Sequence, residues 1–114
     1  MDNEREPDAE RRRGRRTGLR RACTVQLPGA EPRQGMTVDV GVDGLSLYTA
    51  KPVAAGTRCE VHFELPGAEA AQPIRASAKV VYSSYSGTEG FKIGAIFVAL
   101  DPRTTAALLA FSDT

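Results

Sequence analysis

From residue 19 onward, apolar and polar positions alternate in short runs that glycine and proline interrupt. Two runs show the alternation most clearly. In the first, the apolar residues that fall on one face are Cys59, Val61, Phe63 and Leu65; in the second, they are Phe91, Ile93, Ala95 and Phe97. An apolar period of two residues indicates β-strands that are buried on one face. We therefore predict strands at residues 19–27, 35–41, 44–50, 57–65, 74–84 and 90–98, with a core that contains Val61, Phe63, Leu65, Ile93 and Phe97.

Turn-forming residues separate these strands, at Pro28-Gly29, at Pro66-Gly67 and at Ser86-Gly87 with Gly90. Short strands with such punctuation are typical of a small all-β barrel or sandwich. After the last strand, Asp101 can cap a helix that begins at Pro102, and residues 103–111 have the composition of a short helix. Leu108 and Phe111 are three positions apart, so we expect them to cover one mouth of the barrel together.

A chain of 114 residues is long enough for one domain with its own core. Its 41% hydrophobic and 25% charged residues are those of an ordinary globular protein. Neither an apolar run of membrane-spanning length nor a signal peptide is visible, so we expect a cytoplasmic protein. The sequence contains two cysteines, Cys23 and Cys59, and one histidine, which are too few ligands for a structural zinc site within one subunit. We therefore expect both cysteines to be free thiols.

Nothing in the sequence favours catalysis, and we predict that the protein is not an enzyme and has no cofactor. His62 is the one histidine, and its phase in the predicted strand directs it outward between Glu60 and Glu64. No Gly-x-Ser-x-Gly segment and no phosphate-binding loop that ends in Gly-Lys occur. The remaining classes are ligand-binding and interaction domains.

Residues 10–21 read E-R-R-R-G-R-R-T-G-L-R-R and contain seven of the arginines. The formal charge of residues 1–21 is +3, from eight arginines and five acids, and the rest of the chain carries −2. The positive field is therefore local. Guanidinium groups bind phosphates in a bidentate manner and stack on aromatic rings, so a nucleotide is a suitable partner. A solvated tail or a nonspecific nucleic-acid patch are the alternatives.

The spacing within this arginine segment suits a small anionic ligand. Arg12 and Arg16 would lie roughly 6 Å apart on one face of a helix, or about 13 Å apart in an extended chain. Gly14 between them permits backbone conformations that other residues avoid. We expect residues 1–10 to be a disordered tail and residues 11–21 to be a linker, because neither stretch shows apolar periodicity.

A second motif, D-V-G-V-D-G, lies between the second and third predicted strands. Its Asp43-Gly44 pair favours a tight turn, since glycine readily takes positive φ values. On its own the motif is explained by a hairpin turn and nothing more.

Taken together, the two motifs resemble the PilZ domain family, whose pattern is Arg-Arg-x-x-Arg followed by Asp/Asn-x-Ser-x-x-Gly. The first part is matched by Arg12, Arg13 and Arg16, and the ends of the second part are matched by Asp39 and Gly44. Residues 52–58, 78–82 and 91–97 are also similar to the family. The resemblance places a PilZ domain at residues 11–112, including the linker at 11–21.

The resemblance implies a six-stranded antiparallel β-barrel with a short C-terminal helix that binds cyclic di-GMP. The implied ligand-binding residues are Arg12, Arg13, Arg16, Asp39, Gly41 and Gly44. Gly41 stands where the family has serine, so one hydroxyl contact is missing. Gly41→Ser is expected to tighten binding if the site is otherwise intact, unless serine is strained at a positive φ or a neighbouring backbone N–H already makes the contact. We expect ligand binding to order the arginine linker and to change a surface that an unidentified partner protein contacts, and the family suggests motility, surface polysaccharide or development as the regulated process. The alternative is a degenerate domain that binds no nucleotide and serves as a protein-interaction module. Specific nucleic-acid binding and membrane association are not expected.

Overall fold

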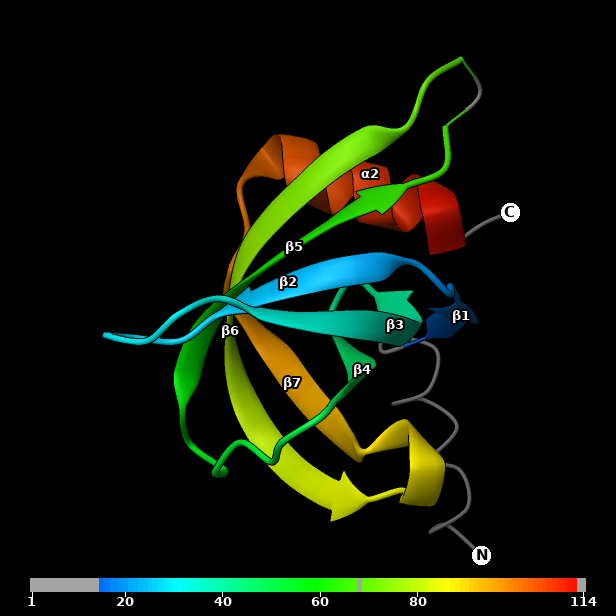
Figure 1. Cartoon of the computed structure of the whole chain (residues 1–114). Coiled ribbons are helices and arrows are strands. Elements are labelled where there is room, and N and C mark those ends of the chain that lie inside the picture. The colour runs from blue at the N-terminus through cyan, green and yellow to red at the C-terminus, as the bar shows by residue number, and fades with distance from the viewer. Residues whose placement is uncertain (1–14, 68, 113–114) are drawn as a thin grey trace, which may run out of the picture.

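The computed structural model describes residues 15–67 and 69–112. Strands dominate this part of the chain, and an α-helix follows the last strand (Figure 1). The elements are β1 (Arg16–Gly18), β2 (Ala22–Gln26), β3 (Arg33–Gly41), β4 (Gly44–Thr49), β5 (Arg58–Leu65), β6 (Gln72–Tyr85), the 3-10 helix η1 (Gly87–Glu89), β7 (Phe91–Ala99) and α2 (Pro102–Ser112).

Six of these strands form a closed antiparallel barrel. The strands are hydrogen-bonded in the order β3, β2, β5, β6, β7 and β4, and pairing of β4 with β3 closes the ring. The short strand β1 adds to β3 beyond the end of β2, so that β1 and β2 follow one another along the same edge of β3. The prediction of a six-stranded antiparallel barrel with a C-terminal helix is confirmed.

The barrel interior contains the apolar positions that the alternation predicted. On β5, Val61 is 1% exposed, and Phe63 and Leu65 are also buried. Ile93 of β7 is buried, whereas Phe97 is half-buried and packs against the edge of the core. The predicted apolar positions therefore face the interior, because each strand of a closed barrel has one side towards the core and one side towards solvent.

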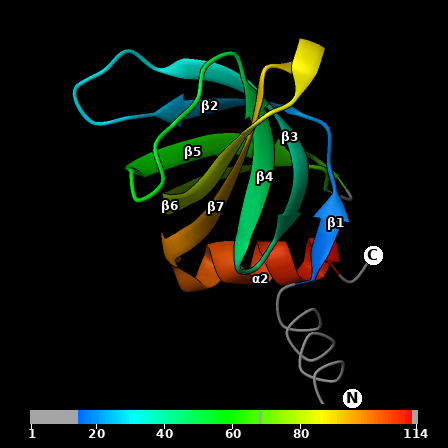
Figure 2. The same ribbon diagram turned by 90° about the horizontal axis from the view of Figure 1, so that it is seen from below.

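Helix α2 lies across one end of the barrel (Figure 2). Leu108 is fully buried there, and Phe111 packs against the core beside it, as the sequence predicted. The helix begins at Pro102, and the Asp101 carboxylate accepts a hydrogen bond from the backbone N–H of Thr104 at 2.7 Å. This N-terminal cap satisfies one of the amides that the first helical turn leaves without a partner.

The start of the barrel differs from the prediction, since the strand expected at 19–27 is shortened to β2 and the linker expected at 11–21 contributes β1. Residues 19–21 interrupt the pairing, and Thr37 fills the interruption with its side chain. Its hydroxyl accepts a hydrogen bond from the Arg21 N–H at 2.9 Å and donates one to the Leu19 carbonyl. Because Thr37 is 1% exposed, its hydroxyl depends on these two bonds and not on water.

Strand β3 contains an irregularity where it faces β4. Thr37 pairs with Leu47 and Asp39 pairs with Ser46, which leaves Val38 as an extra residue on β3. Such a bulge breaks the strict alternation of faces. As a result Thr37 is buried in the barrel wall while Asp39 remains partly exposed on the outside.

Candidate functional site

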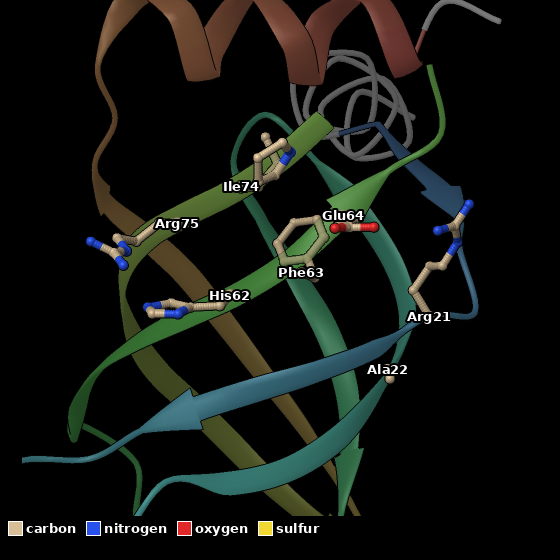
Figure 3. Close-up of a pocket in the computed structure, with 8 residues that line it drawn as sticks. Arg21, Ala22, His62, Phe63, Glu64, Ile74 and Arg75 are labelled. Carbon is tan, nitrogen blue, oxygen red and sulfur yellow. The ribbon is translucent and has the colours of Figure 1, made fainter. Parts of the chain in front are cut away.

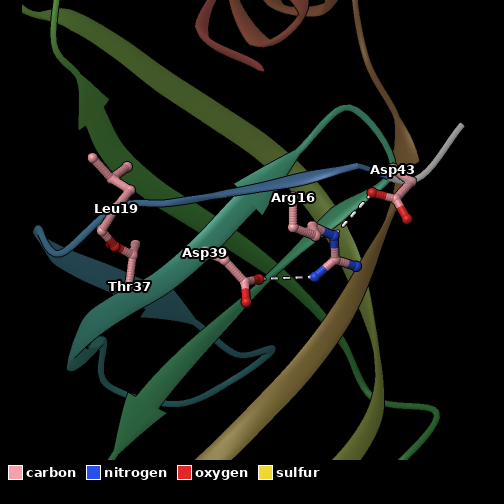
Figure 4. A network of polar contacts seen from close by, with 5 residues as sticks. All are labelled: Arg16, Leu19, Thr37, Asp39 and Asp43. Carbon is pink, nitrogen blue, oxygen red and sulfur yellow. Dashed lines mark hydrogen bonds and ion pairs between the residues drawn. The ribbon is translucent and has the colours of Figure 1, made fainter. Parts of the chain in front are cut away.

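The two sequence motifs meet at Arg16. From β1, the Arg16 side chain reaches Asp39 near the end of β3 and Asp43 in the turn between β3 and β4 (Figure 4). Its Nη1 donates to Asp39 Oδ1 at 3.0 Å, and its Nε donates to Asp43 Oδ1 at 3.0 Å. One guanidinium therefore joins three segments that are distant in the sequence.

The electrostatics of this cluster favour a fixed, charged arginine. Partial burial acts to lower the pKa of Arg16, but the hydrogen bonds and charges of Asp43 and Asp39 outweigh it and raise the pKa above its ordinary value. Arg16 and Asp39 are each 28% exposed, and Asp43 is 42% exposed. One cation against two carboxylates leaves a formal charge of −1, and the guanidinium Nη2 is not used in either ion pair.

Gly41 shapes this site through its lack of a side chain. Gly41 pairs with Arg16 in the register of β1 and β3. A Cβ atom at Gly41 would lie 2.2 Å from the carbonyl oxygen of Arg15, a distance that no real Cβ atom tolerates. Glycine at position 41, where the family pattern has serine, therefore allows the backbone of the arginine segment to approach β3 closely.

Gly44 also permits a close approach of two backbones, and the prediction from the sequence that it takes a positive φ in a tight turn is wrong. Its φ is not positive, so the turn does not depend on a left-handed glycine. A Cβ atom at Gly44 would instead lie 2.2 Å from the carbonyl oxygen of Ala95 on β7. Gly44 is thus required for the close packing of β4 on β7, beside the turn that carries Asp43.

The rest of the arginine segment is described in part. Arg12 and Arg13 lie outside the described residues, as does the tail expected at 1–10. Arg15 Nη1 donates to the carbonyl oxygen of Ser112 at 3.3 Å, which attaches the segment to the last turn of α2. A cation at this position also interacts favourably with the helix dipole.

A row of paired residues crosses the outer side of the barrel wall next to Arg16, and its two middle members, Ser46 and Gly94, are themselves buried. The strand registers pair Asp39 with Ser46, Ser46 with Gly94, and Gly94 with Tyr82. The Tyr82 ring lies over Gly94, because a Cβ atom at Gly94 would be 2.2 Å from Tyr82 Cε2. Tyr82 is 42% exposed, so an aromatic ring and the Asp39 carboxylate stand at the two ends of this row.

Sequence reasoning missed Asp43, Ser46 and Tyr82 as members of the site. Their signal is weak, since each is a common residue in a strand or turn. Only the pairing of β3, β4, β7 and β6 brings them into one row with Asp39.

Two shallow hollows lie on either side of the row along the outer wall. One, of 530 Å³, is lined by Arg20, Met36, Tyr48 and the η1 hairpin among others. The other, of 510 Å³, is lined by Asp43, Ile96 and neighbouring residues. The registers place Met36 with Tyr48 on one side of the Asp39–Ser46 pair, and Gly44 with Ile96 on the other. The surface offers room for a ligand larger than a single phosphate.

A larger hollow of 590 Å³ lies elsewhere, on the outer face of β2, β5 and β6 (Figure 3). It includes Arg21, His62 and Arg75, but the guanidinium groups of Arg21 and Arg75 point away from each other. The His62 Nε2 lies 3.0 Å from a carboxylate oxygen of Glu60, its neighbour on β5. The cations do not converge, so we assign no anion site to this hollow.

Other kinds of site find no support in the described residues. Residues 15–67 and 69–112 contain no cluster of three or more histidine, cysteine, aspartate or glutamate side chains suited to a metal ion. No helix in this part of the chain has the length and apolar character needed to cross a bilayer. Cys23 and Cys59 are free thiols buried in the barrel, and burial raises the pKa of both.

Comparison with known proteins identifies relatives of this chain. A family model described as the PilZ domain matches residues 10–113. Among curated proteins, no match is found.

Among solved structures, the Bacillus subtilis inhibitor of motility superposes with a TM-score of 0.76 at 18% identity, over 86% of this chain and 47% of that chain. The PilZ domain of YcgR from Escherichia coli, solved with c-di-GMP, gives a TM-score of 0.67 at 17% identity, over 86% of each chain. The PlzA protein of Borreliella burgdorferi, in complex with c-di-GMP, gives 0.55 at 13% identity, over 93% of this chain and 37% of that chain. The chain thus spans about half the length of the first of these proteins. At such identities the superpositions establish a shared fold.

Proposed function

Because this chain belongs to the PilZ domain family, a family of non-enzymatic receptor domains for cyclic di-GMP, we propose that it binds cyclic di-GMP itself. The observation that carries the proposal is the meeting of the two motifs. Arg16 from the arginine segment and Asp39 from the second motif lie 3.0 Å apart on the outer barrel wall. YcgR and PlzA, which share this fold, were solved with the same nucleotide.

The site residues match the chemistry of a ligand with two phosphates and two guanines. Arg16 has Nη2 available for a phosphate, and arginine also stacks on purines. The Asp39 carboxylate can accept hydrogen bonds from the N1–H and N2–H₂ groups of a guanine, which adenine lacks. The exposed Tyr82 ring offers a face on which a base can stack.

We propose a substitute for the missing serine on the neighbouring strand. Ser46 is paired with Asp39 across β3 and β4, so its side chain is on the same side of the wall as Asp39; it is 4% exposed, so neighbouring side chains must move aside for a ligand to reach it. In this proposal Ser46 supplies the contact that Gly41 does not. Gly41 and Gly44 allow backbones to approach closely at the site, while Arg12 and Arg13 provide further charge from residues outside the described part of the chain.

Signalling in this proposal depends on the arginine segment and an unidentified protein partner. Ligand binding would order the segment and shift the population of a surface that the partner recognises. Motility is a suitable process, since the similar Bacillus subtilis protein is an inhibitor of motility. A cytoplasmic location follows from the same proposal, because the ligand is an internal messenger.

A second candidate function is a degenerate PilZ domain that acts as an interaction module without ligand. The observation that favours it is the 2.2 Å contact that a Cβ atom at Gly41 would make, since the arginine segment already occupies that part of the wall. In this reading the Arg16 ion pairs are structural and no nucleotide displaces them.

Calorimetric titration of the full chain with cyclic di-GMP distinguishes the two functions. Saturable binding is expected, and Arg16→Ala should weaken it by about 1.5–3 kcal/mol, the scale of a charge-assisted contact. Arg103→Ala, an exposed arginine on α2, is the matched control and should bind like the wild type. Cyclic di-AMP should bind more weakly if Asp39 reads guanine. Failure of the wild type to bind at millimolar ligand would overturn the receptor function and leave the interaction module as the remaining candidate.

A further inference from the structure

Of the two carboxylates that bind Arg16, one has a proposed contact with the ligand and the other has none. Asp39 belongs to the second motif and is assigned to a guanine edge. Asp43 has no assigned ligand contact, yet its Oδ1 receives the Arg16 Nε–H at 3.0 Å. The hydrogen bond with Asp43 raises the pKa of Arg16 more than the one with Asp39 does.

We propose that Asp43 is an internal competitor of the ligand: it occupies Arg16 in the free protein and thereby sets the ligand concentration at which the receptor responds. The inference rests on the proposed function. Its basis is that Nε of Arg16 belongs to the edge of the guanidinium that would otherwise offer a bidentate fork, Nε–H with Nη2–H, to a phosphate. While Asp43 holds Nε, only part of that fork is free.

The charge balance points the same way. Arg16 with both carboxylates carries a formal charge of −1, so a phosphate that approaches Arg16 also approaches a net negative cluster. Removing the charge of Asp43 brings the cluster to neutrality. Since all three side chains are partly exposed, solvent screens the effect and keeps it moderate.

The backbone of Asp43 is anchored independently of its side chain. Its carbonyl oxygen accepts a hydrogen bond from the Phe97 N–H at 2.9 Å, which fixes the turn to β7. The carboxylate can therefore release Arg16 by side-chain rotation while the turn stays in place. A variant at this position should consequently retain the fold.

The test is Asp43→Asn, because asparagine keeps an oxygen that can accept the Nε–H but removes the charge. Calorimetry should show cyclic di-GMP binding that is roughly two- to fivefold tighter than in the wild type, the range of a partly exposed ion pair. Glu64→Gln on β5 removes the same charge away from the site and should leave the affinity unchanged. In an Arg16→Ala background, Asp43→Asn should tighten binding less than it does in the wild type, because only the general repulsion of the anionic ligand is then relieved. Equal or weaker binding by Asp43→Asn would overturn the proposal.

A measurement without ligand separates this inference from the proposed function. In nuclear magnetic resonance spectra, the Arg16 Nε–H proton should exchange slowly with water in the wild type and faster in Asp43→Ala, which lacks the acceptor. Identical exchange in the two proteins would show that Asp43 does not hold Arg16. If the contact is confirmed and no variant binds nucleotide, the proposed function fails and Asp43 is a structural ion-pair partner only.

Discussion

The Arg15 carbonyl oxygen lies where a side chain at Gly41 would begin, 2.2 Å from the position of a Cβ atom. This relationship changes the meaning of the glycine in the second motif. From the sequence, Gly41 is a position that has lost a ligand contact. In the structure, it is the position that lets β1 lie against β3 and brings Arg16 to Asp39 and Asp43.

Gly41→Ser should therefore not tighten ligand binding, contrary to the expectation from the motif alone. The new side chain would displace β1 and cost roughly 1–3 kcal/mol of stability, as overpacking does. Thermal denaturation and calorimetry should show lower stability together with weaker cyclic di-GMP binding. Gly18→Ser is the matched control, because no atom lies within 4 Å of its Cβ position. Normal stability in Gly41→Ser would show that the β1 contact is not tight in solution.

Thr37→Val should destabilise the barrel although it keeps the shape of the buried side chain. The valine cannot bond the Leu19 carbonyl or the Arg21 N–H, which the threonine hydroxyl satisfies. Buried polar groups left without partners cost about 1–3 kcal/mol. Urea denaturation should report this loss, and Thr37→Ser should recover most of it. A Thr37→Val protein as stable as the wild type would show that water reaches these groups.

Tyr82→Ala should weaken cyclic di-GMP binding by about 1–3 kcal/mol, the usual contribution of an aromatic ring that stacks on a base. The ring lies over Gly94 in the row that includes Asp39, so it is within the proposed site. Tyr82→Phe keeps the ring and should bind almost as the wild type does. Equal affinities in all three proteins would remove Tyr82 from the site.

Alkaline pH should destabilise the fold through Cys23. Burial raises the pKa of this thiol from 9.0 to about 11, so the folded state holds the proton more tightly than the unfolded state does. The resulting stabilisation is complete below pH 9.0 and is lost as the pH rises towards about 11, on the order of 2 kcal/mol. Urea denaturation across this range should show a steeper loss in the wild type than in Cys23→Ala. Parallel curves would contradict the prediction.

How much of the molecule could be predicted depends on whether the signal is local. The alternation of Val61, Phe63 and Leu65 lies within one strand, so the core positions followed from the sequence. The cap of α2 by Asp101 was equally local and was also predicted. The strand at residues 16–18 was not, because its three residues carry no apolar pattern and it forms only through pairing with β3.

The sequence by itself determined an all-β domain, the buried face of its strands and the presence of two motifs, because burial of one face imposes a period of two on a strand. The choice of a closed antiparallel barrel over a sandwich came from the family resemblance and not from the period. The tertiary structure decided which side chains meet outside the barrel. The bulge at Val38 sets the direction of Asp39, and the strand order places Tyr82 over Gly94. Pairing between strands distant in the sequence leaves no periodic trace in either one, so only the folded chain shows that Arg16 contacts both Asp39 and Asp43.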